Sequence, residues 1–432
     1  MSLNNHTKEV LSKYIEYLTN NMSYCPVNIL NNKQLEALHN VKIGKNIFIT
    51  GSGGSGKSTC LKSIINWAQE NDINLGVTAS TGAAAFLING RTIHSFLGIG
   101  LGNDTALKLA SKTLATNELV YTRISTLKIL IIDEISMISA ELFKKISEYL
   151  CIIKKNNKPF GGIQIVLSGD FCQLPPIDGD YCFTSDVWKL ANIEMIILEE
   201  LMRQQNDIEF QNILQELRWG NCSESTLEIL KSLKDTTFSD DIVPTKLYST
   251  NINVDKINNI EFEKLLKSGA KKNIYKNKYS KHNDTKKWSE SIKQPKYVEL
   301  CIGAQVLVTY NIDQDIINGT RGCITSMNTN TINIKLVNND IVTIPYVKMI
   351  SAENDKIYVQ FMPLKLAYAL SIHRCQGSTL DAIEIDIGKS IFEYGQAYVS
   401  LSRAKSLKSI KILDVNIKSF KTHPLVKEFY NQ

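Results

Sequence analysis

The sequence has little of what a membrane-spanning or secreted protein needs. Its longest apolar stretches, such as Ile129–Ile132, have the length of a strand, whereas a helix that crosses a bilayer needs about 20 apolar residues. The amino-terminal stretch MSLNNHTKEVLSKYIEYL carries charged residues and asparagines where a signal peptide has an unbroken apolar core. The sequence therefore predicts a protein without a membrane span or an export signal.

Paired cysteines and a strong charge of one sign are also missing. The nine cysteines are odd in number and scattered, and no C-x-x-C pair occurs, which favours reduced thiols over a disulfide framework or a zinc site. An intracellular or intravirion location follows, with the compartment left open. The net charge of +6 is compatible with a polyanionic partner but does not identify one.

What is present is an alternation of short apolar runs with helical stretches, which is typical of an α/β fold with a parallel sheet. The chain of 432 residues is long enough for two or three domains. We expect a helical lead-in over residues 1–30, a first domain over 31–200 and a second over 201–432. The block 303–350 alternates like short antiparallel strands and predicts a small β-barrel inserted in the second domain. The predicted parallel strands are NIFIT (46–50), NLGVTAS (74–80), LKILIIDE (127–134) and IQIVLSGD (163–170).

The stretch GSGGSGKST (51–59) lies between the run NIFIT and a helix-like segment, as a phosphate-binding loop does. Glycines let backbone N–H groups turn towards phosphate oxygens, and the following helix adds the positive end of its dipole. Lys57 is expected to reach the β and γ phosphates and Ser58 to bind Mg²⁺. A flexible Gly-Ser loop before a helix is the alternative. The predicted ATP-binding residues of this loop are Gly51, Gly53, Gly54, Ser55, Gly56, Lys57, Ser58 and Thr59.

Acidic residues follow another predicted strand, at the carboxyl end where such sheets bind ligands. In ILIIDEIS, Asp133 would hold Mg²⁺ through water, and Glu134 would orient and deprotonate the attacking water. A surface acid pair that opens a helix is the alternative. In LSGDFCQLPP, Asp170 and Gln173 reach the same edge, where Gln173 either contacts the γ-phosphate or is only a turn residue. Together these residues predict ATP hydrolysis.

Two arginines after the first domain could complete such a site from the far side of a cleft. Arg203 lies in LEELMRQQ and Arg403 in GQAYVSLSRAKS. An arginine inserted in this way stabilises charge on the γ-phosphate and makes hydrolysis depend on closure. A surface or ion-paired arginine is the alternative for each.

The stretch KKNIYKNKYSKHNDTKKW (271–288) interleaves lysines with Tyr275, Tyr279 and Trp288. Aromatic side chains among cations can stack on the bases of a single strand. A solvated lysine-rich loop or edge strand explains the same pattern and is favoured over the stacking hypothesis.

In this order, the motifs resemble the Petite Integration Frequency (PIF) family of superfamily 1 DNA helicases, which are relatives of the RecD-type motors. The resemblance covers most of the chain, from Leu30 to Ala404. Its most specific part is DEISM followed by FGGIQIVLSGDFCQLPP. The other motifs are GSGGSGKST, VTASTGAAA with TIHSF, LMRQ, AYALSIHRCQGSTLD and YVSLSRA.

The resemblance implies two RecA-like domains with ATP between them, a Src-homology-type barrel at 303–350, and translocation on single-stranded DNA from 5′ to 3′. Duplex DNA with a 5′ single-stranded tail is the implied substrate, for a protein that acts as a monomer. Gln34 would contact the adenine, and Arg203 and Arg403 would contact the γ-phosphate. The positions implied to touch DNA are Ser80, Thr81, His94, His373 and Thr379.

The chain departs from the family pattern in two respects. Arg374 stands where the family often has lysine, which keeps the charge but changes the hydrogen-bond geometry. Long terminal extensions are missing, so we expect a bare helicase core. Roles in DNA replication, repair, recombination or telomere maintenance stay open. So do two rival functions, a nucleotide-dependent switch and a motor that acts on RNA or strips proteins from a strand.

Overall fold

The structure is a computed structural model, and it describes most of the chain from Leu30 onwards. The predicted lead-in over 1–30 therefore lies almost wholly outside the described residues. Within the described part, no helix is long and apolar enough to cross a bilayer. The eight cysteines that the structure describes are all unpaired, as predicted. The described residues are 30–88, 90–100, 102–200, 207–238, 244–282, 285–286, 295–310, 312, 316, 320–336, 339–350, 356–376, 380 and 382–431.

The first half of the chain forms a six-stranded parallel sheet in the order β3-β2-β4-β5-β1-β6. Each of the four predicted runs contains one of its strands, and β3 and β6 are additional. The strands are β1 (Ile47–Thr50), β2 (Leu75–Ala79), β3 (Arg91–Thr92), β4 (Ile129–Asp133), β5 (Gln164–Gly169) and β6 (Glu194–Ile197).

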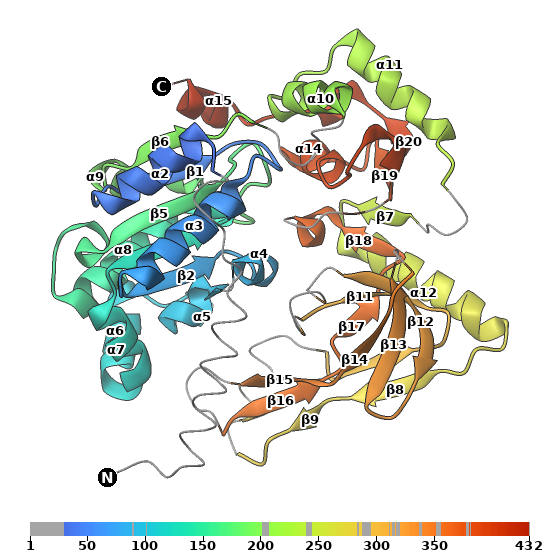
Figure 1. The fold of residues 1–432 in the computed structure, drawn as a ribbon, viewed down its shortest axis with the longest axis horizontal. Coiled ribbons are helices and arrows are strands. Elements are labelled where there is room, and N and C mark those ends of the chain that lie inside the picture. The colour runs from blue at the N-terminus through green and yellow to red at the C-terminus, as the bar shows by residue number, and fades with distance from the viewer. Residues whose placement is uncertain are drawn as a thin grey trace.

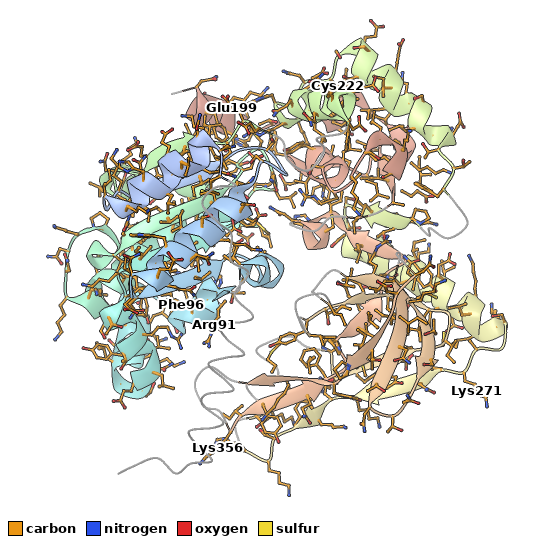
Figure 2. All side chains as sticks on the ribbon, in the orientation of Figure 1. Arg91, Phe96, Glu199, Cys222, Lys271 and Lys356 are labelled. Carbon is orange, nitrogen blue, oxygen red and sulfur yellow. The ribbon has the colours of Figure 1, made fainter. Side chains whose placement is uncertain are left out.

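Helices cover both faces of this sheet (Figure 1), so its central strands are buried throughout. Ile47 and Ile49 pack into the core on one face and Phe48 into the core on the other, because successive side chains point to opposite sides. Figure 2 shows the side chains between these layers, with Phe96 among them. The helices are α2 (Asn32–Lys42), α3 (Lys57–Glu70), α4 (Gly82–Leu87), α5 (Ile93–Leu97), α6 (Ala106–Thr116), α7 (Glu118–Thr126), α8 (Ala140–Lys154) and α9 (Asp186–Leu190), with short 3₁₀ turns at Ile135–Met137, Pro159–Gly162 and Cys182–Thr184.

A second parallel sheet, in the order β18-β7-β19-β20, carries the rest of the α/β fold. Its strands come from both sides of a long insertion, since β7 precedes the insertion and the other three follow it. The elements are α10 (Ile208–Arg218), α11 (Glu224–Ser232), β7 (Thr245–Tyr248), α12 (Asn251–Lys267), β18 (Ala369–Ser371), β19 (Ile383–Ile387), α14 (Gln396–Leu401), β20 (Ile410–Val415) and α15 (Pro424–Tyr430), with 3₁₀ turns η5 (Leu233–Asp235), η6 (Ile372–Cys375), η7 (Leu407–Ser409) and η8 (Ile417–Ser419).

The insertion consists of antiparallel strands, as predicted for 303–350, but it extends further in both directions. Its described strands form three sheets, in the orders β14-β13-β12-β11-β17, β15-β16-β9 and β10-β8. The strands are β8 (Asn273–Lys276), β9 (Lys278–Tyr279), β10 (Tyr297–Leu300), β11 (Gln305–Val308), β12 (Arg321–Met327), β13 (Thr331–Leu336), β14 (Ile341–Pro345), β15 (Val347–Ile350), β16 (Tyr358–Phe361) and β17 (Leu364–Leu366).

The carboxyl-terminal helix α15 returns from the second sheet to the first (Figure 1). Its Phe429 stacks on Phe183, with ring centroids 4.4 Å apart, and its ring is tilted against Phe48 at 6.2 Å. Val426 of the same helix is fully buried in the core of the first sheet. The two parallel sheets are therefore connected twice, once where the chain passes from the first to the second and once through α15.

Candidate nucleotide-hydrolysis site

The loop 51–56 has the backbone of a phosphate-binding loop between β1 and α3. Gly54 and Gly56 have φ angles of 93° and 85°, a left-handed region that L side chains rarely adopt. Gly51 has a φ of 148°, and a Cβ atom at this position would collide with the carbonyl oxygen of Leu198. Glycine is therefore required at all three positions, and α3 begins directly after them at Lys57.

Lys57 lies inside this loop rather than in solvent. Its ammonium group donates hydrogen bonds to the carbonyl oxygens of Gly51 and Ser52, at 2.8 and 2.9 Å. Burial lowers the pKa of Lys57, and the carboxylates of Asp170, Glu134 and Asp133 oppose this shift. The structure thus brings the loop lysine and the acidic residues of two strand ends into one electrostatic cluster.

The predicted acid pair lies at the carboxyl end of β4. Burial and, next, the carboxylate of Glu134 raise the pKa of Asp133 to about 7. Glu134 has a φ of 52°, which is left-handed backbone at a non-glycine residue. The backbone N–H of Glu134 donates a hydrogen bond to Asp133 Oδ1. Strain of this kind is typical of functional positions and persists only where the surroundings hold it.

A side chain from the other half of the chain connects Glu134 with Gln173. The Gln376 Nε2 donates to Glu134 Oε2 at 3.1 Å and to Gln173 Oε1 at 3.3 Å. Gln173 and Gln376 are 3% and 5% exposed, so water does not compete for this pair of hydrogen bonds. Gln376 is within the motif HRCQGST, but sequence reasoning assigned it no role.

Arg403, in the turn directly after α14, lies beside the phosphate loop. A Cβ atom on Gly53 would lie 3.5 Å from Arg403 Nη2, and the Arg403 side chain is 2% exposed. The hydroxyl of Tyr398, from the same helix, accepts a hydrogen bond from the Gly53 backbone N–H at 3.0 Å. Tyr398 lies five residues before Arg403, and sequence reasoning assigned it no role.

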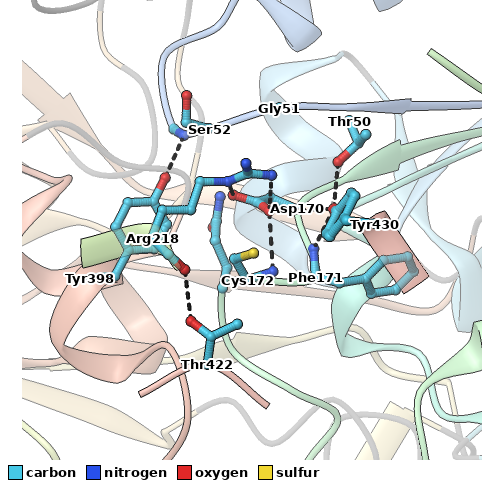
Figure 3. A network of polar contacts seen from close by, with 12 residues as sticks. Thr50, Gly51, Ser52, Asp170, Phe171, Cys172, Arg218, Tyr398, Thr422 and Tyr430 are labelled. Atoms are coloured by element: carbon cyan, nitrogen blue, oxygen red, sulfur yellow. Dashed lines mark hydrogen bonds and ion pairs between the residues drawn. The ribbon is translucent and has the colours of Figure 1, made fainter. Parts of the chain in front are cut away.

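A buried ion pair lies beside the loop (Figure 3). Asp170, at the end of β5, accepts hydrogen bonds from Arg218 Nε and Nη2 at 3.0 and 2.9 Å, and both side chains are buried. Burial by itself raises the pKa of Asp170, but the Arg218 guanidinium outweighs it and holds the pKa below its usual value. The ring of Tyr430, from α15, lies against the Arg218 guanidinium. The Tyr430 hydroxyl forms a hydrogen bond with Thr50 Oγ1 at 2.6 Å. Sequence reasoning found Asp170 but neither Arg218 nor Tyr430.

Gln34 is close to the loop but is engaged with the protein. Its Nε2 donates to the Gly56 carbonyl at 3.2 Å, and its Oε1 accepts from the Asn31 backbone N–H in a capping box at the start of α2. These contacts keep the Gln34 amide beside the phosphate loop.

The residues expected to touch DNA have more varied surroundings. The Ser80 hydroxyl donates to the Glu134 carbonyl at 2.8 Å, whereas Thr81 Oγ1 accepts from the Ala84 N–H and so caps a helix. His94 in α5 and His373 in η6 are half-buried, and burial lowers the pKa of each imidazole.

Several predicted residues lie outside the described part of the chain. These are Arg203, Thr379 and Trp288, together with the side chain of Arg374. The predictions for them stay predictions.

The stacking hypothesis for the lysine-rich stretch is wrong for Tyr275. This ring is 4% exposed and its hydroxyl donates to the Asn328 carbonyl at 2.9 Å, so no base can reach it. Tyr279 is 44% exposed on the edge strand β9, where Val359 and Gln360 pair with this strand. The described part of the stretch forms the edge strands β8 and β9, as the favoured alternative allows, and stacking on Tyr279 stays a prediction.

The arrangement as a whole defines a nucleoside-triphosphate hydrolase with a composite site. A phosphate loop, the acid pair of buried Asp133 and half-buried Glu134, and Gln173 come from the first half, while Gln376, Tyr398 and Arg403 come from the second. The two halves of the chain therefore line one site.

The model of the family described as PIF1-like helicase matches residues 29–228. The chain is 33% identical to the ATP-dependent DNA helicase Pif1 of Psychrobacter sp., over 91% of this chain and 70% of that protein. A crystal structure of Pif1 helicase from Candida albicans aligns with a TM-score of 0.82 and 33% identity, over 93% of this chain and 99% of that one. Pif1 helicase from Bacteroides in complex with ADP-AlF3 and single-stranded DNA aligns with a TM-score of 0.71 and 25% identity, over 93% and 97% of the two chains.

The chain therefore belongs to the PIF1-like helicase family, and it is an ATP-dependent DNA helicase. It spans 61% and 64% of the length of the relatives from Emericella nidulans and Danio rerio.

Proposed function

We propose that the protein moves along single-stranded DNA from 5′ to 3′ and unwinds duplex or structured DNA. Two RecA-like domains, 31–200 and 201–432, would close on ATP and reopen after hydrolysis. The observation that carries this proposal is that Tyr398 and Arg403 meet the phosphate loop at Gly53, because a cleft lined from both sides couples nucleotide state to domain closure.

In this mechanism, the loop amides and Lys57 bind the phosphates, and Gln34 binds the adenine. Glu134 takes a proton from the attacking water, and Gln173 holds the γ-phosphate in line. Arg403, with Arg203, stabilises the charge that develops on the transferred phosphoryl group.

The site residues also fit Mg²⁺. Asp133 supplies a buried carboxylate at a strand end, and Ser58 supplies a hydroxyl at the start of α3. Mg²⁺ in nucleotide sites takes one or two such protein oxygens and completes its shell with phosphate and water. When bound, the ion would neutralise phosphate charge.

Single-stranded DNA is the proposed track. A Bacteroides Pif1 structure holds single-stranded DNA, and another similar structure concerns DNA unwinding at forked duplex DNA by two coordinating Pif1 helicases. In this chain, Ser80, Thr81, His94, His373 and Thr379 would contact the strand. Phosphate contacts would supply most of the affinity, so binding should weaken steeply with salt and show little base preference.

We also propose that the insertion closes into a Src-homology-type barrel and that the protein works as a monomer. The five-stranded antiparallel sheet around 303–350 supports the barrel.

The test of this function compares DNA duplexes that carry a 5′ or a 3′ single-stranded tail. We expect unwinding of the 5′-tailed duplex only, and ATP hydrolysis that rises when single-stranded DNA is added. Equal unwinding of both substrates would contradict the polarity. Hydrolysis without any response to DNA would favour the nucleotide switch, and a stronger response to RNA would favour an RNA-directed motor.

Two variants separate binding from chemistry. Lys57→Ala should abolish ATP turnover, with Lys62→Ala on the same helix as the control. Arg403→Ala should keep ATP binding while turnover falls, by about 10³-fold or more as for other arginines of this kind. Normal turnover of Arg403→Ala would show that the site is not two-sided.

A further inference from the structure

Glu134 is held at two points, by one proposed DNA contact and by a residue close in sequence to two others. Its backbone carbonyl accepts the hydrogen bond of Ser80, itself a proposed DNA contact. Its carboxylate accepts the hydrogen bond of Gln376, which lies three residues after His373 and three before Thr379. Two loops that would grip the strand therefore converge on the general base.

The orientation of the Gln376 amide follows from its partners. A carboxylate oxygen can only accept a hydrogen bond, so the amide nitrogen and not the oxygen must face Glu134. The same nitrogen has a second N–H, which Gln173 accepts. The buried Oε1 of Gln376 has no hydrogen-bond partner among the described residues, so the amide is held through its nitrogen.

The backbone of Glu134 makes this support necessary. A left-handed conformation at a non-glycine residue costs roughly 1–2 kcal/mol. The base therefore does not keep its place by local preference, and the contacts from Ser80 and Gln376 hold it. A small shift of the loop around Gln376 would release the carboxylate.

We propose that Gln376 is a positioning residue through which DNA binding switches on hydrolysis. This rests on the proposed function, in which His373, three residues before Gln376, contacts the strand. A bound strand fixes the loop around Gln376, and the Gln376 amide then holds Glu134 and Gln173 in the arrangement that activates the attacking water. Without DNA, the loop is less restrained and the base is aligned for a smaller fraction of the time.

This role predicts a loss of rate rather than of affinity. The hydrogen bonds of the Gln376 side chain go to Glu134 and Gln173, and within the described residues none goes to the phosphate loop. Misplacing a catalytic group by about 1 Å can cost about 10²-fold in rate, so a lost tether acts on kcat.

The test is Gln376→Met, which keeps the length and apolar volume of the side chain but removes the amide. We expect kcat with saturating oligo-dT to fall about 10- to 100-fold. The DNA-free rate should fall much less, so the stimulation by DNA shrinks. The KM for ATP and the Kd for oligo-dT should change less than about twofold, since ground-state binding is untouched.

Two further variants guard against a merely structural effect. Gln305→Met removes an equally buried glutamine whose Nε2 donates to the Ala367 carbonyl in the insertion, and it should leave the DNA stimulation unchanged. Gln376→Asn keeps the amide but withdraws it by one methylene. It should fold as the wild type does, as judged by thermal unfolding, and still lose part of the stimulation.

A double-mutant cycle with Gln173→Met tests the connection itself. If the two side chains act as one unit, the combined variant should lose much less than the product of the two single losses. Full DNA stimulation in Gln376→Met and Gln376→Asn would overturn the proposal while leaving the helicase function intact. A wild type that DNA does not stimulate would instead overturn the proposed function.

Discussion

The side-chain size at position 53 limits how closely Arg403 can approach the phosphate loop. A methyl group at this position would lie 3.5 Å from Arg403 Nη2 and from Ser402, which is ordinary contact, so the additional methyl groups of a branched side chain would press on these neighbours. We expect Gly53→Val to displace Arg403 and to lower kcat by about 10²-fold or more, because the arginine acts on the transition state. ATP binding, measured with a fluorescent nucleotide, should be retained.

Gly53→Ala is the matched control for this prediction. Its smaller side chain should leave Arg403 in place and keep most of the turnover. Equal losses in the alanine and valine variants would show that the glycine serves the loop backbone rather than the arginine.

Asp133 makes stability depend on pH. Its pKa of about 7 in the folded protein lies above the ordinary 3.8, so the folded state binds this proton more tightly than the unfolded chain. The contribution of this tighter proton binding to the free energy of unfolding is complete below pH 3.8, the ordinary pKa. It is lost as the pH rises through about 7.

Asp133→Asn should therefore stabilise the protein in the absence of metal and nucleotide, although it removes activity. We expect a gain of a few kcal/mol near pH 8, since a shift from 3.8 to about 7 corresponds to roughly 4 kcal/mol, and a clearly smaller gain near pH 5, measured by urea unfolding in EDTA. The exposed Asp255→Asn should change neither value. A gain of the same size at both pH values would mean that burial of the charge is not the cause.

At the scale of elements, the ion pair between β5 and α10 joins the two halves of the chain. Arg218→Met leaves the Asp170 carboxylate buried without its partner, which costs about 3–5 kcal/mol. The exposed pair of Lys108 and Asp104 on α6 offers the contrast, since Lys108→Met should cost less than about 1 kcal/mol. Denaturant unfolding of both variants measures the difference, and similar values would contradict the role of burial.

The elements themselves were largely predictable. The runs around β1, β2, β4 and β5 are apolar at successive positions because helices cover both faces, and such runs are easily found in a sequence. The strands β10 and β16 lie outside the predicted block 303–350 and were missed because they have no comparable signature. The orientation of Tyr275 was also missed, since the same alternation allows either face of β8 to be buried.

At the scale of the whole molecule, a shared pocket predicts that nucleotide stabilises both halves together. ADP with aluminium fluoride at about 100 times its Kd should add about 2.7 kcal/mol to the free energy of unfolding. Calorimetry should show a single transition that moves upwards, and Arg403→Ala should reduce the shift. Two transitions, of which only one moves, would show that the nucleotide binds one half alone.

The sequence by itself determined what neighbouring residues specify together. The loop 51–59, the acid pair at Asp133 and the strands beside them are each written in a few consecutive residues, because backbone conformation and strand burial are local properties. The family could be assigned from the order of such motifs.

Only the tertiary structure decided which distant residues meet. Gln376 is 242 positions from Glu134, and Tyr398 is 345 positions from Gly53. Nothing in the local sequence fixes such pairs, because they depend on how two sheets and a returning helix pack against each other. The sequence therefore predicted the phosphate loop, the acid pair and an arginine from the second half, whereas the contacts of Gln376 and Tyr398 with the first half came only from the structure.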